Sequence, residues 1–570
     1  MISALGCAST SRAKAKGRSG SGAQTAQGFP RAEELKRISA QPKPALQGSF
    51  RFGEVERWVL SGPLPADHQR RPHPAEDVLA KQLVANAGAR IPTAALHCAA
   101  REAGLFLLSS GKLPAPGLQR FIAGRCGATT GIELRSLYGE GDQEANADVI
   151  AGQWEASLTK LLGVAQGPVE VGAWFGVSGK RAGAIVAVAV PRSQLAEIRQ
   201  EGPSFLIRGA AVGQGSVRAM VNQGAFGVAP CESRAVDASA FELVCPVNAA
   251  DEATWIQIAV FPPGRFLGEE AASLLVRPSG AEAKEYRGAA GAKGAAGAGD
   301  EALRTEVVGA VNAVRAAAGL GALRVSLEQT RTAQEAAPYY FAGQLGVIDP
   351  RIAETVALGM RAGWQVGGAL QYGLFTASVV ASSSPRAMVD LAVDTPFGRE
   401  VLLDPRVSWI AVGLLEQPAE GWGGAMFSTY AMHEPEPSGQ LRKQLSDRLQ
   451  KARLQAGRMP FDAIPDAEAD VEPVLSLYDG DSENTDPVLK QAMNAVARRT
   501  KLGVRAWLVT ADTVDRLPLP GELIKAEGRR LTIAVSWVRP PDEPWGRYVA
   551  LIVVEAPMTA ARPPKPLRSA

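Results

Sequence analysis

The sequence predicts an α+β protein of several domains, in which a small β-sandwich lies among mixed modules of helices and strands. Three observations predict this class. Segments with helical periodicity precede strand-like segments three times along the 570 residues. Residues 201–286 contain short β-rich segments separated by glycine and proline, which is typical of a small β-sandwich. Residues 287–300 consist mostly of glycine and alanine, which predicts a linker between domains.

The composition is that of a globular protein with three or four domains. Hydrophobic residues make up 46% of the chain, enough for buried cores, and charged residues make up 21%. The formal net charge is only +3, so the charge balance gives no reason to expect a nucleic acid partner. No apolar run in the sequence approaches the length of a membrane-spanning helix.

The first ten residues are similar to the end of a bacterial lipoprotein signal peptide. Small residues precede Cys7, and a polar segment follows it. Because the basic and apolar regions of such a signal are missing, we expect the coding region to begin upstream. In this interpretation Cys7 carries the lipid, and residues 1–48 are a lipoprotein-like N-terminus and flexible tether. The alternative is a cytosolic protein with a frayed N-terminus.

Four further cysteines have spacings that favour two local disulfides. Cys98 lies in an apolar helical segment and Cys126 ends the next one, so this pair would join two antiparallel helices. Cys231 and Cys245 bracket a strand-like segment, and closing that loop would contribute about 3 kcal/mol in the chain-entropy model. The alternative is free, buried thiols. Disulfides favour an extracytoplasmic protein, lipid-anchored at the periplasmic or outer-membrane face of the envelope, or secreted.

The segment before the linker is expected to hold two domains. The first is an α+β domain over residues 49–200, and the second is the β-sandwich over residues 201–286. The predicted helices of the first domain are 76–86, 94–108 and 148–162, its strands are 169–176 and 183–190, and the sandwich strands include 216–221, 241–245 and 254–261.

Two more α+β domains are predicted after the linker, over residues 301–435 and 439–557, followed by a basic tail at 558–570. Helices precede a hairpin in all three α+β segments, which suggests a threefold repeat. The similarity of Gly172-Ala-Trp174 to Ala506-Trp507 agrees with that hypothesis, and chance periodicity is the alternative.

Two motifs between residues 301 and 432 are more specific. Asn312, Arg315, Gly319 and Leu323 follow the pattern N-x-x-R-x-x-x-G-x-x-x-L. Residues 395–413, TPFGREVLLDPRVSWIAVG, follow S-P-x-H-R-x-x-L-L-x-P-x-x-x-x-I-G-V-G. Both motifs resemble the CAP family (cysteine-rich secretory, antigen 5 and pathogenesis-related proteins), in its bacterial SCP-like branch. The resemblance covers about a quarter of the chain.

The resemblance implies an α-β-α sandwich with a central antiparallel sheet. Many members of the family also hold a divalent cation with two histidines and two glutamates, whose nitrogen and oxygen donors suit such an ion. Here Ala336 and Gly398 occupy the histidine positions, and no acidic residue lies between Arg361 and Thr376, where a glutamate is expected. Since neither residue has a side-chain donor, we expect a degenerate member without metal or other cofactor. Arg399 would then cap or pair locally.

No other pattern predicts a catalytic residue. His97 adjoins Cys98, but neighbours on a helix point apart, which favours a structural role over a Cys–His nucleophile pair. Residues 479–486 offer carboxylates to calcium but lack the glycine and glutamate of an EF-hand loop, which favours a solvated loop. Trp422 lies at a predicted hairpin tip, where it would either pack in the core or anchor a partner.

These observations favour a non-catalytic envelope protein that binds or scaffolds. Its partners would be the membrane, through the lipid anchor, and a protein, lipid or glycan ligand. A hydrolase acting on peptide, glycan or lipid is one alternative, because an active site between domains leaves no trace in sequence spacing. A lipid or small-molecule carrier is another, which the resemblance to the CAP family suggests.

Overall fold

The computed structural model divides into two compact units. Among the described residues, the first unit comprises 29–365 and 374–429, and the second comprises 366–373 and 430–556. The structure describes residues 29–46, 52–53, 57–60, 90–140, 169–178, 181–213, 215–235, 240–250, 253–263, 267–278, 285–288, 300–380, 384–417, 422–434, 436–464, 466–480, 485–500, 503–511, 513–540 and 543–556.

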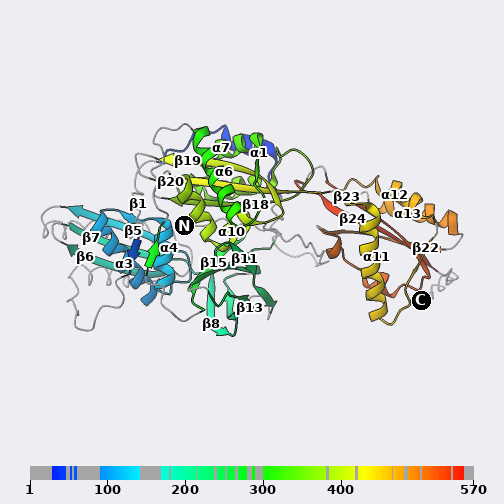
Figure 1. Ribbon diagram of the computed structural model, residues 1–570, viewed down its shortest axis with the longest axis horizontal. Coiled ribbons are helices and arrows are strands. Elements are labelled where there is room, and N and C mark those ends of the chain that lie inside the picture. Colours follow the sequence, from blue (N-terminus) through cyan, green and yellow to red (C-terminus); the bar gives the residue numbers. More distant parts are fainter. Residues whose placement is uncertain are drawn as a thin grey trace, which may run out of the picture. The chain divides into compact units, whose positions relative to one another are not determined.

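The architecture is α+β, as the sequence predicts, with helices packed on small sheets (Figure 1). Three four-stranded sheets share one strand order. In each, the strand that comes first in the chain lies at one edge, followed by the third, the fourth and the second. The first strand runs parallel to the third in all three sheets. This shared topology supports the hypothesis of a threefold repeat.

The three sheets define an N-terminal, a central and a C-terminal module. The first sheet lies in the first unit, the second lies mainly there, and the third lies in the second unit. In spatial order, their strands are β3 (Arg90–Pro92), β6 (Val169–Ser178), β7 (Arg181–Ala189) and β5 (Glu133–Glu140); β17 (Arg324–Val325), β19 (Val407–Gln417), β20 (Trp422–Met432) and β18 (Leu370–Val380); and β21 (Asp462–Ala463), β23 (Arg530–Val538), β24 (Arg547–Ala556) and β22 (Gly503–Ala511).

The tryptophan match that agreed with the repeat does not align equivalent strands. Trp174 lies on β6, the third strand of its module, whereas Trp507 lies on β22, the second strand of its module. The hypothesis of a repeat therefore depends on the sheet order rather than on this match.

A buried arginine connects the first helix of the central module to later segments. Arg315 lies on α6 (Asp300–Ala317) and is 1% exposed. Its Nε donates to the Gly321 carbonyl at 2.7 Å, and its Nη1 donates to the carbonyls of Leu402 and Asp404 at 2.7 and 3.1 Å. Burial lowers the pKa of this guanidinium. The arginine of the first family motif therefore has a structural role.

The C-terminal module repeats this arrangement. Arg453 lies on α11 (Ser438–Gln455) and is 3% exposed. Its Nε donates to the Met459 carbonyl at 2.9 Å, and its Nη1 donates to the carbonyls of Ile524 and Ala526 at 2.8 and 3.1 Å. In both modules the Nε of the arginine donates to the carbonyl of the residue six positions later in the sequence. The two modules thus share a hydrogen-bonding device as well as a sheet order.

A side-chain amide one turn before each arginine completes the match. Asn312 donates to the Leu323 carbonyl at 3.2 Å and accepts from the Leu323 N–H at 2.8 Å. Gln450 donates to the Phe461 carbonyl at 2.8 Å and accepts from the Phe461 N–H at 2.8 Å. Each amide therefore fixes the residue that leads into the first strand of its sheet.

The β-sandwich consists of two four-stranded sheets around one apolar core. Its first strand, β8, begins at Ser193, so nearly all of it falls inside the segment assigned by sequence to the previous domain. Cys231 and Cys245 form a disulfide within the sandwich. The strands are β8 (Ser193–Glu201), β9 (Ser204–Ala211), β10 (Ser216–Gln223), β11 (Gly227–Pro230), β12 (Glu232–Ala235), β13 (Ala240–Pro246), β14 (Thr254–Phe261) and β15 (Glu269–Val276).

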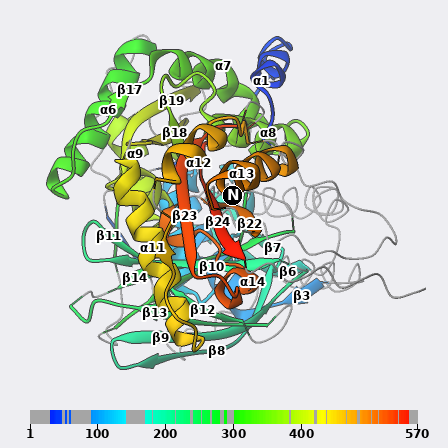
Figure 2. The ribbon, with the colours of Figure 1, turned by 90° about the vertical axis from the view of Figure 1, so that its right-hand side faces the viewer.

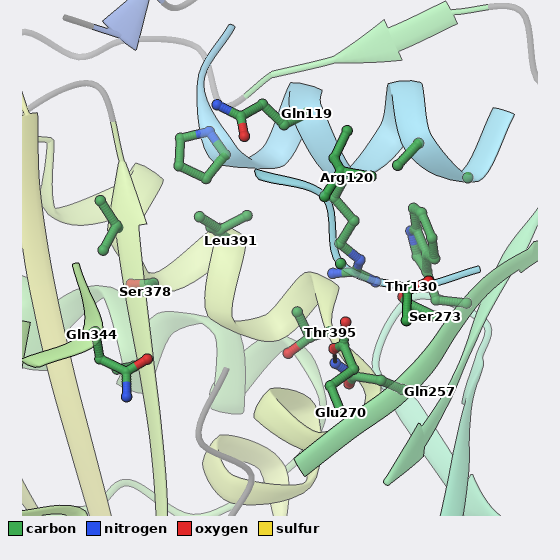
Figure 3. Close-up of a pocket in the computed structure, with 18 of the residues that line it drawn as sticks. Gln119, Arg120, Thr130, Gln257, Glu270, Ser273, Gln344, Ser378, Leu391 and Thr395 are labelled. Carbon is green, nitrogen blue, oxygen red and sulfur yellow. Dashed lines mark hydrogen bonds between the residues drawn. The ribbon is translucent and has the colours of Figure 1, made fainter. Parts of the chain in front are cut away.

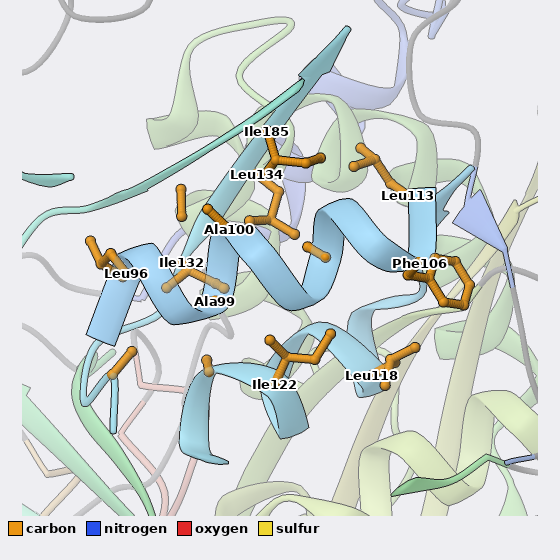
Figure 4. Packing of buried hydrophobic residues seen from close by; sticks show 14 of the residues in the cluster. Leu96, Ala99, Ala100, Phe106, Leu113, Leu118, Ile122, Ile132, Leu134 and Ile185 are labelled. Carbon is orange, nitrogen blue, oxygen red and sulfur yellow. The ribbon is translucent and has the colours of Figure 1, made fainter. Parts of the chain in front are cut away.

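Two helices pack on each other in the N-terminal module and are joined by a disulfide between Cys98 and Cys126. They are α3 (Ala94–Ser110) and α4 (Pro116–Arg125), and Thr93 caps the first of them by accepting from the Leu96 N–H. Figure 4 shows apolar side chains of both helices meeting those of the sheet. The labelled members of this core include Leu96, Ala99, Ala100, Phe106, Leu118, Ile122, Ile132, Leu134 and Ile185.

A short helix, α1 (Ala32–Ser39), occupies part of the segment that the sequence predicts as a flexible tether. Leu35 and Ile38 are buried and lie on one face of α1, three residues apart. The Trp364 indole N–H donates to the Pro30 carbonyl at 2.8 Å. The tether prediction is wrong for residues 29–46, because two apolar residues are enough to dock a short helix on a preformed surface. Cys7 lies outside the described residues.

The central module carries five helices among its described residues, and the C-terminal module carries helices on both faces of its sheet. Figure 2 shows α11 on one side of that sheet and α12 and α13 on the other, and each side has its own apolar core. The remaining helices are α7 (Leu327–Gln344), α8 (Pro350–Ala362), α9 (Pro385–Asp394), α10 (Pro396–Leu403), α12 (Glu468–Leu475), α13 (Thr485–Thr500), α14 (Gly521–Lys525) and the 3₁₀ turn η2 (Val514–Arg516).

Two pairs of short strands occur besides the main sheets. Strand β1 (Phe52–Gly53) pairs in parallel with β4 (Leu113–Pro114), and β2 (Arg57–Val59) pairs with β16 (Glu285–Arg287) in antiparallel fashion. The second pair brings the end of the sandwich segment back to the start of the N-terminal module. The predicted helices 76–86 and 148–162, most of the linker 287–300 and the tail 558–570 lie outside the described residues.

We predict that Arg453→Met lowers the free energy of unfolding by about 3 kcal/mol, because three partly buried carbonyls lose a charged donor. Arg458→Met is the matched control, since Arg458 lies in the same connection and is exposed. Urea unfolding of the two variants checks this. Equal stability of Arg453→Met and the wild type would show that the arginine does not hold the module together.

Candidate functional site

A pocket lies in the first unit where the N-terminal module, the sandwich and the central module meet. Helix α4 forms one wall, strands β14 and β15 form another, and α7, β18 and α9 close it. Its volume is about 130 Å³. Figure 3 shows polar side chains from all three parts facing this space. The cavity is close in size to an engineered apolar cavity of about 150 Å³ that holds benzene.

Local structure places α4 against the pocket. Pro116 is suited to the first turn of the helix because it needs no N–H donor there. The Gln119 side chain donates to the Pro114 carbonyl at 2.7 Å, which fixes the entry to the helix. The Cys98–Cys126 disulfide fixes its other end. The face of α4 between these points is therefore held rigidly.

Arg120 projects from α4 into the pocket (Figure 3). Its guanidinium carbon lies 3.9 Å from the centre of the Trp255 ring, a cation–π contact. Its Nη2 donates to the Asp394 carbonyl at 3.3 Å, and its Nη1 lies 3.7 Å from the Asp394 carboxylate. Burial lowers the pKa of the guanidinium, although the charges of Asp394 and Glu270 oppose this. Arg120 thus holds its charge in a poorly solvated place.

Two atoms of Arg120 stay unsatisfied. Its Nε and Nη1 are buried and have no hydrogen-bond partner among the described residues. The carboxylate nearest to Nη1, that of Asp394, is 52% exposed, so water screens much of its charge. Donors of this kind bind an acceptor strongly when one is offered.

Gln257 fixes the neighbouring acidic side chain. Its Nε2 donates to the Glu270 carboxylate, and its Oε1 accepts from the Phe397 N–H of α10 at 3.3 Å. Gln257 is buried, so both contacts are shielded from water. Glu270 therefore has a defined position in the pocket, set jointly by the sandwich and the central module.

Further polar atoms with unmet hydrogen bonds face the pocket. Ser273 is 7% exposed, and its Oγ has no partner among the described residues. The same holds for Gln344 Oε1. In Figure 3, Ser273 lies on the side of the pocket that holds the Arg120 guanidinium, and Gln344 lies on the opposite side. The remaining lining is mostly apolar and includes Phe52, Ile132, Phe341, Leu345, Val379 and Leu391.

Ala336 and Gly398, which stand where the resemblance expects histidines, are tightly packed. Ala336 is fully buried in α7. At Gly398, an added Cβ would lie 2.1 Å from the Ala392 carbonyl oxygen and 2.4 Å from Thr395 Oγ1. Neither residue lines the pocket. In the described part of the chain, no three His, Cys, Asp or Glu side chains come together as a metal site, and the expected lack of a cofactor stays a prediction.

Arg399 reaches further than the sequence suggests. Its Nε donates to the Val393 carbonyl at 3.0 Å, which is the expected local contact. Its Nη1 also donates to the carbonyls of Gly224 and Gly227 in the sandwich, at 3.0 and 2.9 Å. Arg399 thus helps to hold the central module against the sandwich.

Two other predicted residues have structural places. His97 Nδ1 lies 3.1 Å from the Ala173 carbonyl oxygen and 3.2 Å from its N–H, so it links α3 to β6. Cys98 is in a disulfide and cannot act as a nucleophile beside it. Trp422 is 3% exposed, so the option of a partner anchor is wrong and the core option holds. Residues 481–484 of the acidic loop lie outside the described residues.

Sequence reasoning missed the pocket. Arg120 stands in Leu118–Ala123, where four of the six residues are apolar, and a charged residue at such a place is a weak signal of a special environment. Nothing in the sequence indicates that this position meets Trp255, which is more than a hundred residues away.

Comparisons with known proteins add little. No family model and no curated protein matches the chain. Among solved structures, a cysteine-rich secretory protein from Staphylococcus aureus subsp. aureus Mu50 matches with 10% sequence identity and a TM-score of 0.17. The match covers 42% of this chain and 83% of that chain. A TM-score this low supports no statement about the site, so any CAP relation depends on the residues themselves.

We predict that Gly398→Ala lowers the free energy of unfolding by about 1–3 kcal/mol, because the added methyl group has no room. The matched control is Gly309→Ala on α6, where an added Cβ meets nothing within 4 Å and better helix propensity should stabilise slightly. Chemical unfolding of both variants checks this. If Gly398→Ala is as stable as Gly309→Ala, the position is open to a side chain and the degenerate-site interpretation fails.

Proposed function

We propose that the protein is a non-catalytic binding protein of the cell envelope and that its ligand occupies the pocket between the modules of the first unit. The observation that carries this proposal is the pocket itself, with its apolar walls and several buried polar atoms that have no partner among the described residues. Pockets of this composition are typical of sites that bind small molecules.

We also propose that the central module is a degenerate CAP-like domain and that the other two modules are related to it. The support comes from the Arg315 and Asn312 contacts, which give both motif residues a packing role. The same contacts at Arg453 and Gln450, and the shared sheet order, extend the relation to the C-terminal module. Retained packing residues without metal donors favour binding over metal chemistry.

The two disulfides indicate an oxidising, extracytoplasmic environment. No described helix is long and apolar enough to span a bilayer. Attachment through a lipid on Cys7 remains part of the proposal, because it depends on the sequence pattern alone.

Lipid attachment predicts that the protein, expressed from its own chromosomal locus, incorporates radiolabelled palmitate. Cys7→Ser should remove the label, because the thioether-forming sulfur is absent. Cys98→Ser is the control, since it changes a disulfide cysteine and should leave the label in place. A wild-type protein that takes up no palmitate would contradict the anchor.

The binding proposal predicts that purified protein binds the small neutral probe 2-phenylethanol, measured by isothermal titration calorimetry. Ala377→Leu should weaken binding about tenfold or more, because a larger side chain on β18 fills the pocket. Ala302→Leu on the exposed face of α6 is the matched control and should bind like the wild type. Binding that is unaffected by Ala377→Leu would place the ligand elsewhere.

A further inference from the structure

We infer that the ligand of the pocket carries a single carboxylate, which Arg120 binds, on a small apolar body. This inference depends on the proposed binding function and specifies the ligand class. It starts from the two nitrogens of Arg120 that lack acceptors among the described residues. A carboxylate oxygen can accept a charge-assisted hydrogen bond from either of these donors.

The surroundings of Arg120 leave its charge incompletely neutralised. Asp394 is largely solvated, and its carboxylate lies beyond hydrogen-bonding distance from Nη1 at 3.7 Å. Glu270 is held by Gln257 and makes no ion pair with Arg120 within 4.0 Å among the described contacts. Stacking on Trp255 holds the guanidinium plane in place before any ligand arrives. A preorganised and unsatisfied cation of this kind is suited to capture an anion.

The other groups limit what the anion can be. Glu270 faces the same side of the pocket, so its negative charge disfavours a ligand group with two negative charges, such as a phosphate monoester. Ser273 Oγ can donate to a second carboxylate oxygen on that side. The lining beyond them is apolar, which suits a ring or a short acyl chain.

The side of the pocket opposite Arg120 favours a hydrogen-bond donor at the other end of the ligand. Gln344 Oε1 is a buried acceptor without a partner among the described residues, and it lies opposite Arg120 in Figure 3. A hydroxyl or amide N–H at the distal end of the ligand would satisfy it. A small aromatic or aliphatic acid with a distal donor therefore fits the site best.

The test compares phenylacetate with 2-phenylethanol, which share a ring and chain length but differ in charge, by calorimetry on the intact protein. We expect the wild type to bind phenylacetate about tenfold or more tightly than 2-phenylethanol. Arg120→Met should remove this preference while keeping the affinity for 2-phenylethanol. Arg386→Met on α9 is the matched control, because Arg386 is exposed in a surface ion pair, and it should keep the preference.

Each outcome decides between the inference and the function on which it depends. Equal binding of the two probes by the wild type would overturn the carboxylate inference and leave the pocket as the binding site. A preference that survives Arg120→Met would assign the carboxylate to another cation and would also overturn it. Failure of the wild type to bind either probe would count against the proposed function as well. The wild-type comparison alone decides the inference if Arg120→Met does not fold.

Discussion

The central and C-terminal modules depend on a buried guanidinium that donates to backbone carbonyls. Arg315 and Arg453 each connect a long helix to the loop that follows it and to a segment about seventy to ninety residues further along the chain. Leu402 and Ile524 lie in the last turns of α10 and α14, where carbonyls have no partner within the helix, and leaving them unsatisfied would be costly. An arginine can serve several of them at once because its donors lie in one plane and its charge persists at all relevant pH values.

This constraint leaves the surface of a module free for other contacts. Once the helix, the loop and the sheet edge are fixed, positions outside the network are free to pack against a neighbour. Residues 395–413 illustrate this. Arg399 donates to carbonyls of the sandwich, and Thr395, which caps α10 by accepting from the Gly398 N–H, also lines the pocket. Residues that stabilise a fold in one module thereby build a cavity at its border.

Local sequence patterns predicted part of the fold. Helix periodicity placed α3 at almost its observed bounds, and the spacing of Cys98 and Cys126 on consecutive helices favoured the disulfide that forms. Helix α1 was missed because its two buried residues have value only against α7 and α8. The pocket was also missed because its residues meet only through tertiary packing. Arg120, Trp255 and Gln344 lie far apart in sequence, and no local pattern records that the N-terminal module, the sandwich and the central module bring them together.

The same rule of donors and acceptors governs the scaffold and the pocket. At Arg315 and Arg453 the chain supplies several carbonyls, so these guanidinium groups are satisfied internally and contribute stability. At Arg120 the described chain supplies one carbonyl, that of Asp394, and leaves two nitrogens without acceptors. Burying a cation in that state destabilises the folded protein relative to an apolar side chain at the same place. An acceptor from outside the chain would offset this loss of stability by accepting from these two Arg120 nitrogens. The pocket beside Arg120 has space for such an acceptor.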